Sequence, residues 1–452
     1  MSREVDAYFK LPGLFLMLIS LTNHCYLACT KLNPYNLCAM NESRVDVTQL
    51  LRRDPQAWTA LLSSQPGMED VIVTAVTSQP IQRKHSLADH SPRVTRYVLV
   101  LDNHSDPISL IGKETTAGEA SFYKDIAGNF PFLVPHCYFT HIIDDRGWVI
   151  LDDVPNDFPQ GCWSVEDVEN VIDDIATYHS AYWDQKKIKN QFPWLTHFID
   201  RQGKTYDWTQ LRSELGPFFE VGPSAMISDH ALRHLGRLAP KFIEAANGVA
   251  VMRALGGWPG VLSESHLMAA SDLLDDPVPI LEPLSRLPQT LLHGDLHTYH
   301  WHITLFDQRR LLDWSNVTIG PGIYDLISFQ ERFELLISGD KIRPIYAWED
   351  SPVDEETIID SYMLAMKAEL GKQFDARAVR QAIPAARCLL VLTNWFPYFA
   401  SLFDDMPDVF TWQRLNRIPS SELEQRTVDQ IYVYRPFLKR VFRRFLQAYH
   451  ML

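Results

Sequence analysis

The period of the hydrophobic pattern changes once along this chain, close to Pro155. Before that point, the apolar residues fall in short β-branched runs bounded by Asp, Asn, Ser and Pro, which is typical of antiparallel strands. A helix is predicted over 47–62 with an interruption near Pro55, and another over 118–129 with Gly128-Asn129 as its stop signal. The predicted strands are 71–79, 93–102, 108–114, 137–144 and 146–154, the last two paired as a hairpin around Asp145.

Beyond Ser164 the pattern becomes helical. Residues 164–167 have the form of a capping box, and apolar residues then recur at helical spacing. Apart from short strands around Leu291 and Leu311, most of the remainder predicts helices. Separation of strands from helices indicates an α+β fold with two lobes and a cleft between them. We expect an N-lobe over 46–155 and a helical C-lobe over 156–452.

Composition narrows the class of protein. Hydrophobic residues make up 46% and charged residues 22% of the chain, which is typical of a globular protein. A formal net charge of −14 argues against broad electrostatic binding of nucleic acid. The six cysteines are scattered without CxxC spacing, so we expect free thiols and a cytoplasmic location. The sequence does not indicate the oligomeric state.

The first 45 residues are an extension of uncertain status. Residues 11–21 are apolar, but they supply only about half of the roughly 20 residues that a spanning helix needs. Glu4 and Asp6 precede this stretch and argue against a signal peptide. We therefore expect no stable membrane insertion, and translation from Met40 is an alternative.

The segment 291–314 holds the densest group of chemically active side chains, with four histidines and three aspartates. Transfer of a γ-phosphoryl group to an alcohol needs a carboxylate that orients the hydroxyl, Mg²⁺ held by oxygen ligands, and a cation near the phosphates. Asp295 lies in a predicted loop and Asp313 at the end of a predicted strand, with Asp307 at the turn between them. These positions allow Asp295 and Asp313 to face one cleft.

These residues resemble the aminoglycoside and choline kinase-like phosphotransferases, distant relatives of protein kinases. The family signature HGDxHxxN, then DW or DF, then GxxxYDL corresponds here to 293–300, 313–314 and 320–326. Upstream, Gly112-Lys113 and the E-x-x-F-Y segment from Glu119 resemble the family's strand lysine and its partner helix. Residues 150–153 resemble the hinge, and the whole resemblance extends over about 71–410.

The resemblance implies a two-lobed protein kinase-like fold that binds ATP and Mg²⁺ and transfers phosphate to a hydroxyl of a small molecule. Asp295 would be the catalytic base and Asp313 the principal Mg²⁺ ligand. Lys113 would hold the α- and β-phosphates, fixed by Glu119, and adenine would lie against the backbone near Asp153. The residues expected to brace the catalytic loop are His293, His297 and Asp325.

Two departures from the family pattern affect this expectation. His300 stands where the family has an asparagine that ligates a second Mg²⁺, and imidazole nitrogen is a poor ligand for this ion. The site would then use one Mg²⁺, accept Mn²⁺, or belong to a degenerate kinase that binds nucleotide without efficient turnover. In addition, the expected phosphate-covering segment 78–93 contains no glycine, so side chains such as Ser86 would have to grip the nucleotide.

Other interpretations remain open. A metallohydrolase could use His293, Asp295, His297, His300 and His302 as Zn²⁺ ligands, although no HExxH or HxHxDH pattern completes the site. The acceptor is not readable, because the aromatic residues of 395–399 suit a cation clasp and also suit ordinary core packing. His179 and Trp183 are expected in the core. The basic amphipathic helix 438–449 could lie on a membrane, but we expect it to pack on its own lobe.

Overall fold

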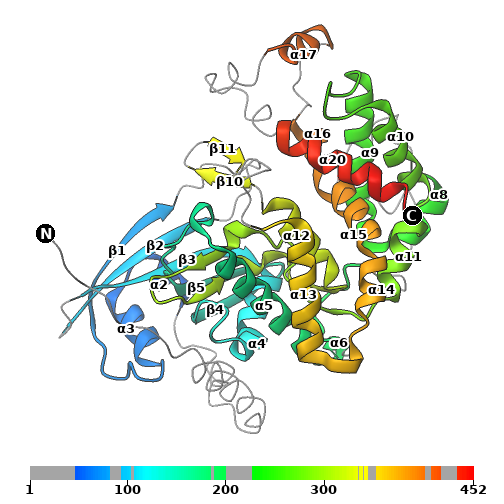
Figure 1. Cartoon of the computed structure of the whole chain (residues 1–452). Coiled ribbons are helices and arrows are strands. Elements are labelled where there is room, and N and C mark those ends of the chain that lie inside the picture. The colour runs from blue at the N-terminus through cyan, green and yellow to red at the C-terminus, as the bar shows by residue number, and fades with distance from the viewer. Residues whose placement is uncertain are drawn as a thin grey trace, which may run out of the picture.

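The computed structural model describes residues 46–81, 93–102, 106–184, 188–199, 227–333, 335–338, 341–344, 353–402, 409–418 and 435–452. The extension 1–45 and most of the expected phosphate-covering segment, including Ser86, lie outside this part of the chain. In Figure 1 the strands of the first part gather on one side, and the helices of the second part gather on the other. The predicted α+β fold class with a β-rich N-lobe and a helical C-lobe is confirmed.

The N-lobe contains a five-stranded antiparallel sheet in the order β1-β2-β3-β5-β4. All five predicted strands occur, with small shifts at their ends. Asp144, with φ 54°, begins the tight turn of the β4–β5 hairpin, a left-handed conformation that Asp tolerates. The strands are β1 Val73–Ile81, β2 Val94–Leu101, β3 Ile108–Thr116, β4 Cys137–Ile143 and β5 Arg146–Asp152.

Three helices complete the N-lobe. The region predicted as one interrupted helix forms two, α2 (Val47–Leu51) and α3 (Pro55–Ser63), because Pro55 occupies the first turn of α3, where its missing N–H costs little. Their apolar residues, including Trp58, pack on one face of the sheet. Helix α4 (Ala117–Asp125) begins directly after β3, with Thr116 as its cap, and a 3₁₀ turn η2 (Ala127–Asn129) follows it.

The C-lobe begins with α5 (Val165–Ala181), whose predicted capping box forms between Ser164 and Asp167. Most of the lobe is helical, and its apolar side chains form one large core. The other α-helices are α6 Ile188–Gln191, α8 Asp229–Leu235, α9 Ala239–Ala254, α10 Glu264–Asp275, α11 Val278–Arg286, α12 Ile323–Arg332, α13 Glu355–Leu370, α14 Ala376–Gln381, α15 Ile383–Leu390, α16 Phe396–Leu402, α17 Val409–Leu415 and α20 Arg435–Tyr449. The short 3₁₀ and π turns are η3 Gln160–Cys162, η4 Gly236–Leu238, η6 Trp314–Asn316, η7 Gly371–Gln373 and η8 Val391–Trp395.

Short strands of the C-lobe form two-stranded pairs around the segment rich in His and Asp. The predicted strands near Leu291 and Leu311 are β6 (Thr290–Leu292), which pairs with β9 (Thr318–Gly320), and β8 (Arg309–Leu311), which pairs with β7 (Trp301–Ile303). The sequence prediction of helices elsewhere was wrong for one further hairpin, β10 (Leu335–Ser338) with β11 (Lys341–Pro344). The Gly-Asp pair between its apolar runs is a hairpin signal that outweighs local helix propensity.

The last helix packs on its own lobe, as expected. Its apolar stripe, formed by Leu438, Val441, Phe442 and Phe445, is buried, and Phe442 lies 5.5 Å between ring centroids from Phe396. The aromatic residues Trp395, Phe396 and Phe399 are likewise buried, as core packing predicts. In the described part of the chain, no helix has both the length and the apolar character needed to cross a membrane.

Candidate active site

A cavity of about 390 Å³ lies between the sheet and the C-lobe. Side chains from β1, β2, β3 and β5 form its N-lobe wall, and Leu312 and Asp313 contribute from the C-lobe. Lys113, Glu119 and Asp153, the residues expected to bind nucleotide, all line it. The cavity therefore lies where the sequence predicted the nucleotide.

Lys113, Glu119 and Asp313 meet in this cavity, and we call them the lysine triad. The Lys113 Nζ lies 2.6 Å from Glu119 Oε2 and 2.5 Å from Asp313 Oδ1, although Lys113 and Asp313 are 200 positions apart. The Glu119 carboxylate also accepts a hydrogen bond of 3.1 Å from the backbone N–H of Trp314 and contacts the Thr115 hydroxyl. Two carboxylates share one ammonium group, so the triad carries a net negative charge that suits a cation.

The short connection from β3 to α4 explains why Lys113 and Glu119 lie side by side. Lys113 lies near the end of β3 and is 5% exposed, while Glu119 lies in the first turn of α4 and is fully buried. Because Thr116 caps α4 immediately, the Glu119 side chain returns toward the strand. Burial of both groups requires that they be paired, because an isolated charge in the interior is costly.

The Asp153 side chain is held by the sheet. Its carboxylate accepts hydrogen bonds from Arg96 Nε at 2.5 Å and from the Ser109 hydroxyl at 2.6 Å. The side chain is therefore engaged within the N-lobe wall, which leaves the backbone near residue 153 as the group that would face adenine.

A tight backbone turn shapes the loop 293–300, which we call the histidine loop. Gly294 has φ +82°, and a Cβ atom there would lie 2.1 Å from the carbonyl oxygen of Asn316, so glycine is required. The buried Asp325 carboxylate accepts hydrogen bonds from the N–H groups of His293 at 2.6 Å and Gly294 at 3.0 Å. His293 Nε2 in turn donates to the carbonyl of Leu312 at 2.9 Å. The Asp325 and His293 side chains thus connect the histidine loop to α12 and to the backbone at Leu312.

Two residues of α5, Tyr178 and His179, extend this network. The Tyr178 hydroxyl donates to Asp325 Oδ2 at 3.0 Å, and His179 Nε2 lies 3.5 Å from the same oxygen. Burial lowers the pKa of His179, although Asp325 opposes this effect. His179 is fully buried, as the core interpretation predicted, but it also contacts a residue that supports the histidine loop. Trp183 is buried as well.

Asp295 lies beside a cation that the sequence analysis missed. The Arg332 Nη1 is 2.8 Å from Asp295 Oδ1. Burial alone would raise the pKa of Asp295, but the Arg332 guanidinium and the nearby histidines hold that pKa well below its ordinary value. The GxxxYDL block could have indicated Arg332, because residues seven apart on a helix are about two turns apart and share a face, which places it with Asp325 on α12.

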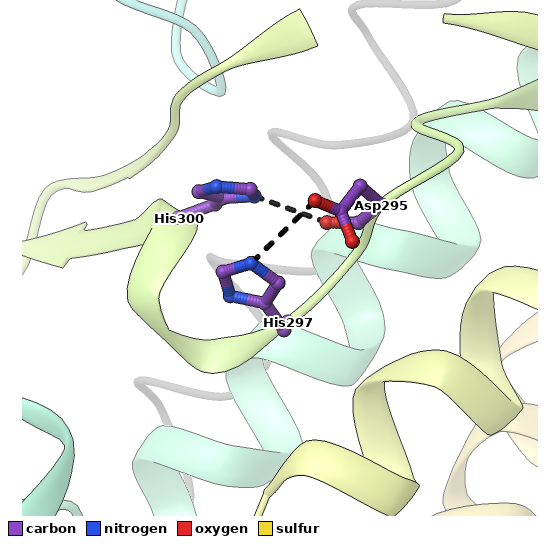
Figure 2. A group of neighbouring side chains, drawn as sticks. All are labelled: Asp295, His297 and His300. Atoms are coloured by element: carbon purple, nitrogen blue, oxygen red, sulfur yellow. Dashed lines mark hydrogen bonds and ion pairs between the residues drawn. The ribbon is translucent and has the colours of Figure 1, made fainter. Parts of the chain in front are cut away.

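His297 and His300 complete the surroundings of Asp295 (Figure 2). The His297 Nε2 lies 3.8 Å from Asp295 Oδ2, and His300 Nδ1 donates to the Asp295 carbonyl at 3.0 Å. His297 also caps the 3₁₀ turn η5 (Thr298–His300), since its Nδ1 accepts a hydrogen bond from Tyr299 N–H. Burial lowers the pKa of His297 well below its ordinary value and that of His300 to about 4, so both rings are neutral at pH 7.

His300 also links Asp295 to the lysine triad. Its Nε2 lies 3.6 Å from Asp313 Oδ2, and its carbonyl accepts a hydrogen bond of 2.8 Å from Leu312 N–H. Asp313 itself has φ 63°, a left-handed conformation uncommon outside glycine and frequent at functional sites. The two aspartates expected to serve acceptor and metal are therefore connected through one imidazole ring.

The five residues of the alternative hydrolase site do not all converge. Asp295, His297 and His300 each place a potential ligand atom within 4.8 Å of the others. His293 instead bonds the Leu312 carbonyl, and His302 Nδ1 bonds the Val154 carbonyl at 2.8 Å. His302 instead lines the cavity between the sheet and the C-lobe.

Comparison with known proteins supports the resemblance seen in the sequence. Residues 207–342 match the model of a family described as the phosphotransferase enzyme family. That segment includes Asp295, Asp313 and Asp325, and the match confirms the predicted resemblance to this group of enzymes. No curated protein sequence matches the chain.

The chain is also similar to solved structures, three of which are named as kinases or phosphotransferases. A choline kinase from Cryptosporidium parvum is 10% identical, with 87% of this chain and 95% of that chain covered and a TM-score of 0.46. A spectinomycin phosphotransferase in complex with ADP and spectinomycin is 11% identical, with 91% and 100% covered and a TM-score of 0.40. An ethanolamine kinase from Plasmodium vivax is 10% identical, with 85% and 91% covered and a TM-score of 0.39.

Proposed function

We propose that this chain is an ATP-dependent phosphotransferase that moves the γ-phosphoryl group to a hydroxyl of a small molecule. The observation that carries the proposal is the contact of Lys113 with both Glu119 and Asp313 in the cavity between the lobes. The match to the phosphotransferase family supports this class of reaction. We infer ATP as the nucleotide, Mg²⁺ as the metal and a hydroxyl of a small molecule as the acceptor.

The lysine triad would bind the phosphates and the metal. Lys113 supplies positive charge for the α- and β-phosphates, and the Asp313 carboxylate offers the oxygen that Mg²⁺ prefers. When bound, Mg²⁺ neutralises charge that develops on the β- and γ-phosphates. The Asp313 oxygens fit this ion, whereas the neutral His300 ring beside them does not, so we assign one Mg²⁺ to Asp313 and expect Mn²⁺ to substitute well.

Asp295 would orient the acceptor. Arg332 holds Oδ1, which leaves Oδ2 to accept the hydrogen bond of the incoming hydroxyl. The acceptor oxygen bonds to the γ-phosphorus while the bond to the bridging oxygen of ADP breaks, and the hydroxyl proton passes to Oδ2. Because Arg332 lowers the pKa of Asp295, the carboxylate serves mainly to align the hydroxyl and takes the proton late in a loose transition state.

A degenerate kinase-like protein that binds nucleotide with little turnover is the second candidate. It is favoured by the ion pair of Asp295 with Arg332 and by the replacement of the family asparagine by His300. In that case the cavity would still bind ATP, while phosphoryl transfer would be slow. Measurement of binding and turnover in the same preparation separates the two candidates.

We also assign a role to each lobe and a cellular location to the protein. We assign nucleotide binding to 46–155 and the catalytic loop and acceptor site to 156–452, with no role in nucleic-acid binding. Free thiols at Cys137, Cys162 and Cys388 support a reducing, cytoplasmic location.

The test is ADP release over a panel of aminoglycosides, amino alcohols, sugars and steroid alcohols, together with ATP binding by calorimetry. The proposal predicts ATP binding and acceptor-dependent ADP release with at least one class of alcohol. ATP binding without acceptor-dependent release across the panel supports the degenerate candidate. Failure to bind ATP in the presence of Mg²⁺ or Mn²⁺ contradicts both candidates.

A further inference from the structure

We propose that Asp295, His297 and His300 form a binding site for a divalent transition-metal ion of the Zn²⁺ type. One potential ligand atom from each residue lies within 4.8 Å of the other two. All three come from the histidine loop, with the spacing Asp-x-His-x-x-His. Figure 2 shows both imidazole rings beside the Asp295 side chain, one above the other.

The donor set selects the class of ion. Two imidazole nitrogens and one carboxylate oxygen suit Zn²⁺ or Co²⁺, whereas Mg²⁺ prefers oxygen ligands throughout. Three protein ligands with a further position left for water or substrate are also the arrangement found in many zinc sites that remain open to small molecules. The site is therefore chemically distinct from the magnesium site assigned to Asp313.

Each ring makes one backbone contact, which sets its tautomer. His300 Nδ1 donates to the Asp295 carbonyl at 3.0 Å, so in its neutral form Nε2 carries the lone pair. Metal-ligating histidines commonly donate their second ring N–H to a carbonyl in this way. His297 Nδ1 accepts a long hydrogen bond of 3.3 Å from Tyr299 N–H. Binding of an ion at His297 Nε2 would move the ring proton to Nδ1 and give up that one contact.

The carboxylate can serve the ion without losing its existing partner. Arg332 Nη1 contacts Asp295 Oδ1, while His297 Nε2 faces Oδ2 at 3.8 Å. The two ring centroids of His297 and His300 are 3.8 Å apart, with planes inclined by 33°, so a modest rotation of the rings brings their nitrogens toward one point. Oδ2 completes the set as a single oxygen ligand.

Occupancy of this site would inhibit phosphoryl transfer, a consequence that rests on the proposed function. Because Arg332 holds Oδ1, the ion and the acceptor hydroxyl would need the same oxygen of Asp295. The ion would also hold His300, whose Nε2 lies 3.6 Å from Asp313 Oδ2. Bound Zn²⁺ would therefore block alignment of the acceptor hydroxyl. Mg²⁺ would not displace the Zn²⁺, because two of the three ligands are imidazole nitrogens.

The site itself is tested without activity, by equilibrium dialysis of the full nucleotide-free chain against Zn²⁺ with metal content measured by atomic absorption. We expect one tightly bound Zn²⁺ per chain in the wild type, and binding weakened at least about tenfold in His297→Gln and in His300→Gln. The control is the double variant His230→Gln/His234→Gln, which removes an exposed histidine pair on α8 with ring centroids 4.7 Å apart. Circular dichroism confirms that each variant is folded.

The site is overturned if the loop variants bind Zn²⁺ as tightly as the wild type, or if the α8 variant loses the tight ion. Absorption spectra of the Co²⁺-loaded protein give a second readout, because replacing a ring nitrogen in His297→Gln should change the ligand-field bands while the α8 variant keeps them. Unchanged bands in His297→Gln would also overturn the site.

Inhibition is tested separately, by titrating Zn²⁺ into the ADP-release assay at saturating Mg²⁺. Wild type should lose activity as Zn²⁺ reaches one equivalent, while the residual activity of His297→Gln should require at least about tenfold more Zn²⁺ for the same fractional loss. Equal sensitivity of the two proteins overturns the inhibitory role. If no acceptor supports turnover, the proposed function fails while the dialysis still decides whether the ion binds.

Discussion

The two sides of the interlobe cleft differ in how their charges are balanced. On the nucleotide side, the lysine triad has two carboxylates on one ammonium group and lines an open cavity of about 390 Å³. On the acceptor side, the single carboxylate of Asp295 is surrounded by Arg332, His297 and His300. The first side suits an incoming metal-bound nucleotide, whereas the second has most of its hydrogen-bonding capacity already engaged. Nucleotide binding and turnover should therefore respond differently to mutation.

The largest effect is expected from Lys113→Ala. Removal of the ammonium leaves the Glu119 and Asp313 carboxylates adjacent without the cation that they share, and loss of one partner of a buried ion pair costs about 3–5 kcal/mol of unfolding free energy. ATP binding should also be lost. Urea unfolding and calorimetry measure the two effects, with Lys124→Ala on the exposed face of α4 as the control. A variant with unchanged stability and ATP affinity would show that the lysine triad neither stabilises the fold nor binds ATP.

Asp295→Asn tests the other side of the cleft. The amide cannot accept the hydroxyl proton, so acceptor-dependent ADP release should fall by about 10²-fold or more, the usual contribution of general acid–base catalysis. ATP affinity should stay nearly unchanged, because the Asp295 side chain pairs with Arg332, whereas Lys113 pairs with Asp313. Parallel loss of ATP affinity would mean that the two sides are not separate.

His300→Asn is expected to have a smaller effect, in the opposite direction. An amide oxygen beside Asp313 would supply the ligand type that Mg²⁺ prefers, so Mg²⁺-dependent ADP release should rise several-fold relative to release with Mn²⁺. Steady-state rates with each ion provide the measurement. A lower rate with both ions would show that the imidazole is an adapted part of the site.

Arg332→Gln should give the smallest of these effects, which is a change in how the unfolding free energy depends on pH. The pKa of Asp295 is lowered in the folded chain, so its stabilising contribution is present above the ordinary pKa of about 3.9 and is lost as pH falls through the lower folded value. Without the guanidinium, the folded pKa rises toward the ordinary value. The fall in unfolding free energy from pH 5 to pH 3 should therefore be smaller in the variant, as measured by urea unfolding. An identical pH profile would show that Arg332 does not control this carboxylate.

Local sequence patterns predicted most of the fold that positions the site. The five strands of the N-lobe, the capping box at Ser164 and the turn between the last two predicted strands all depend on residues close together in the chain. The HGD, DW and YDL blocks located the residues that surround the cleft. In each case the spacing of residue types is itself the physical requirement.

The features that were missed depend on contacts between distant segments. Arg332 reaches Asp295 because α12 packs behind the histidine loop, and the spacing to Asp325 showed the shared helix face without identifying the target. His179 is a core residue by pattern, and its contact with Asp325, like that of Tyr178, joins α5 to a side chain on α12 that lies far away in the sequence. The hairpin β10–β11 is an exception, because its Gly-Asp signal is local and the sequence analysis did not use it.

The most direct test of the separate roles of the two aspartates is calorimetric titration of ATP, with and without Mg²⁺, into the wild type, Asp313→Asn and Asp295→Asn. We predict that Mg²⁺ tightens ATP binding in the wild type and in Asp295→Asn, and that this enhancement disappears in Asp313→Asn. Enhancement that survives in Asp313→Asn, or that disappears in Asp295→Asn instead, would contradict it.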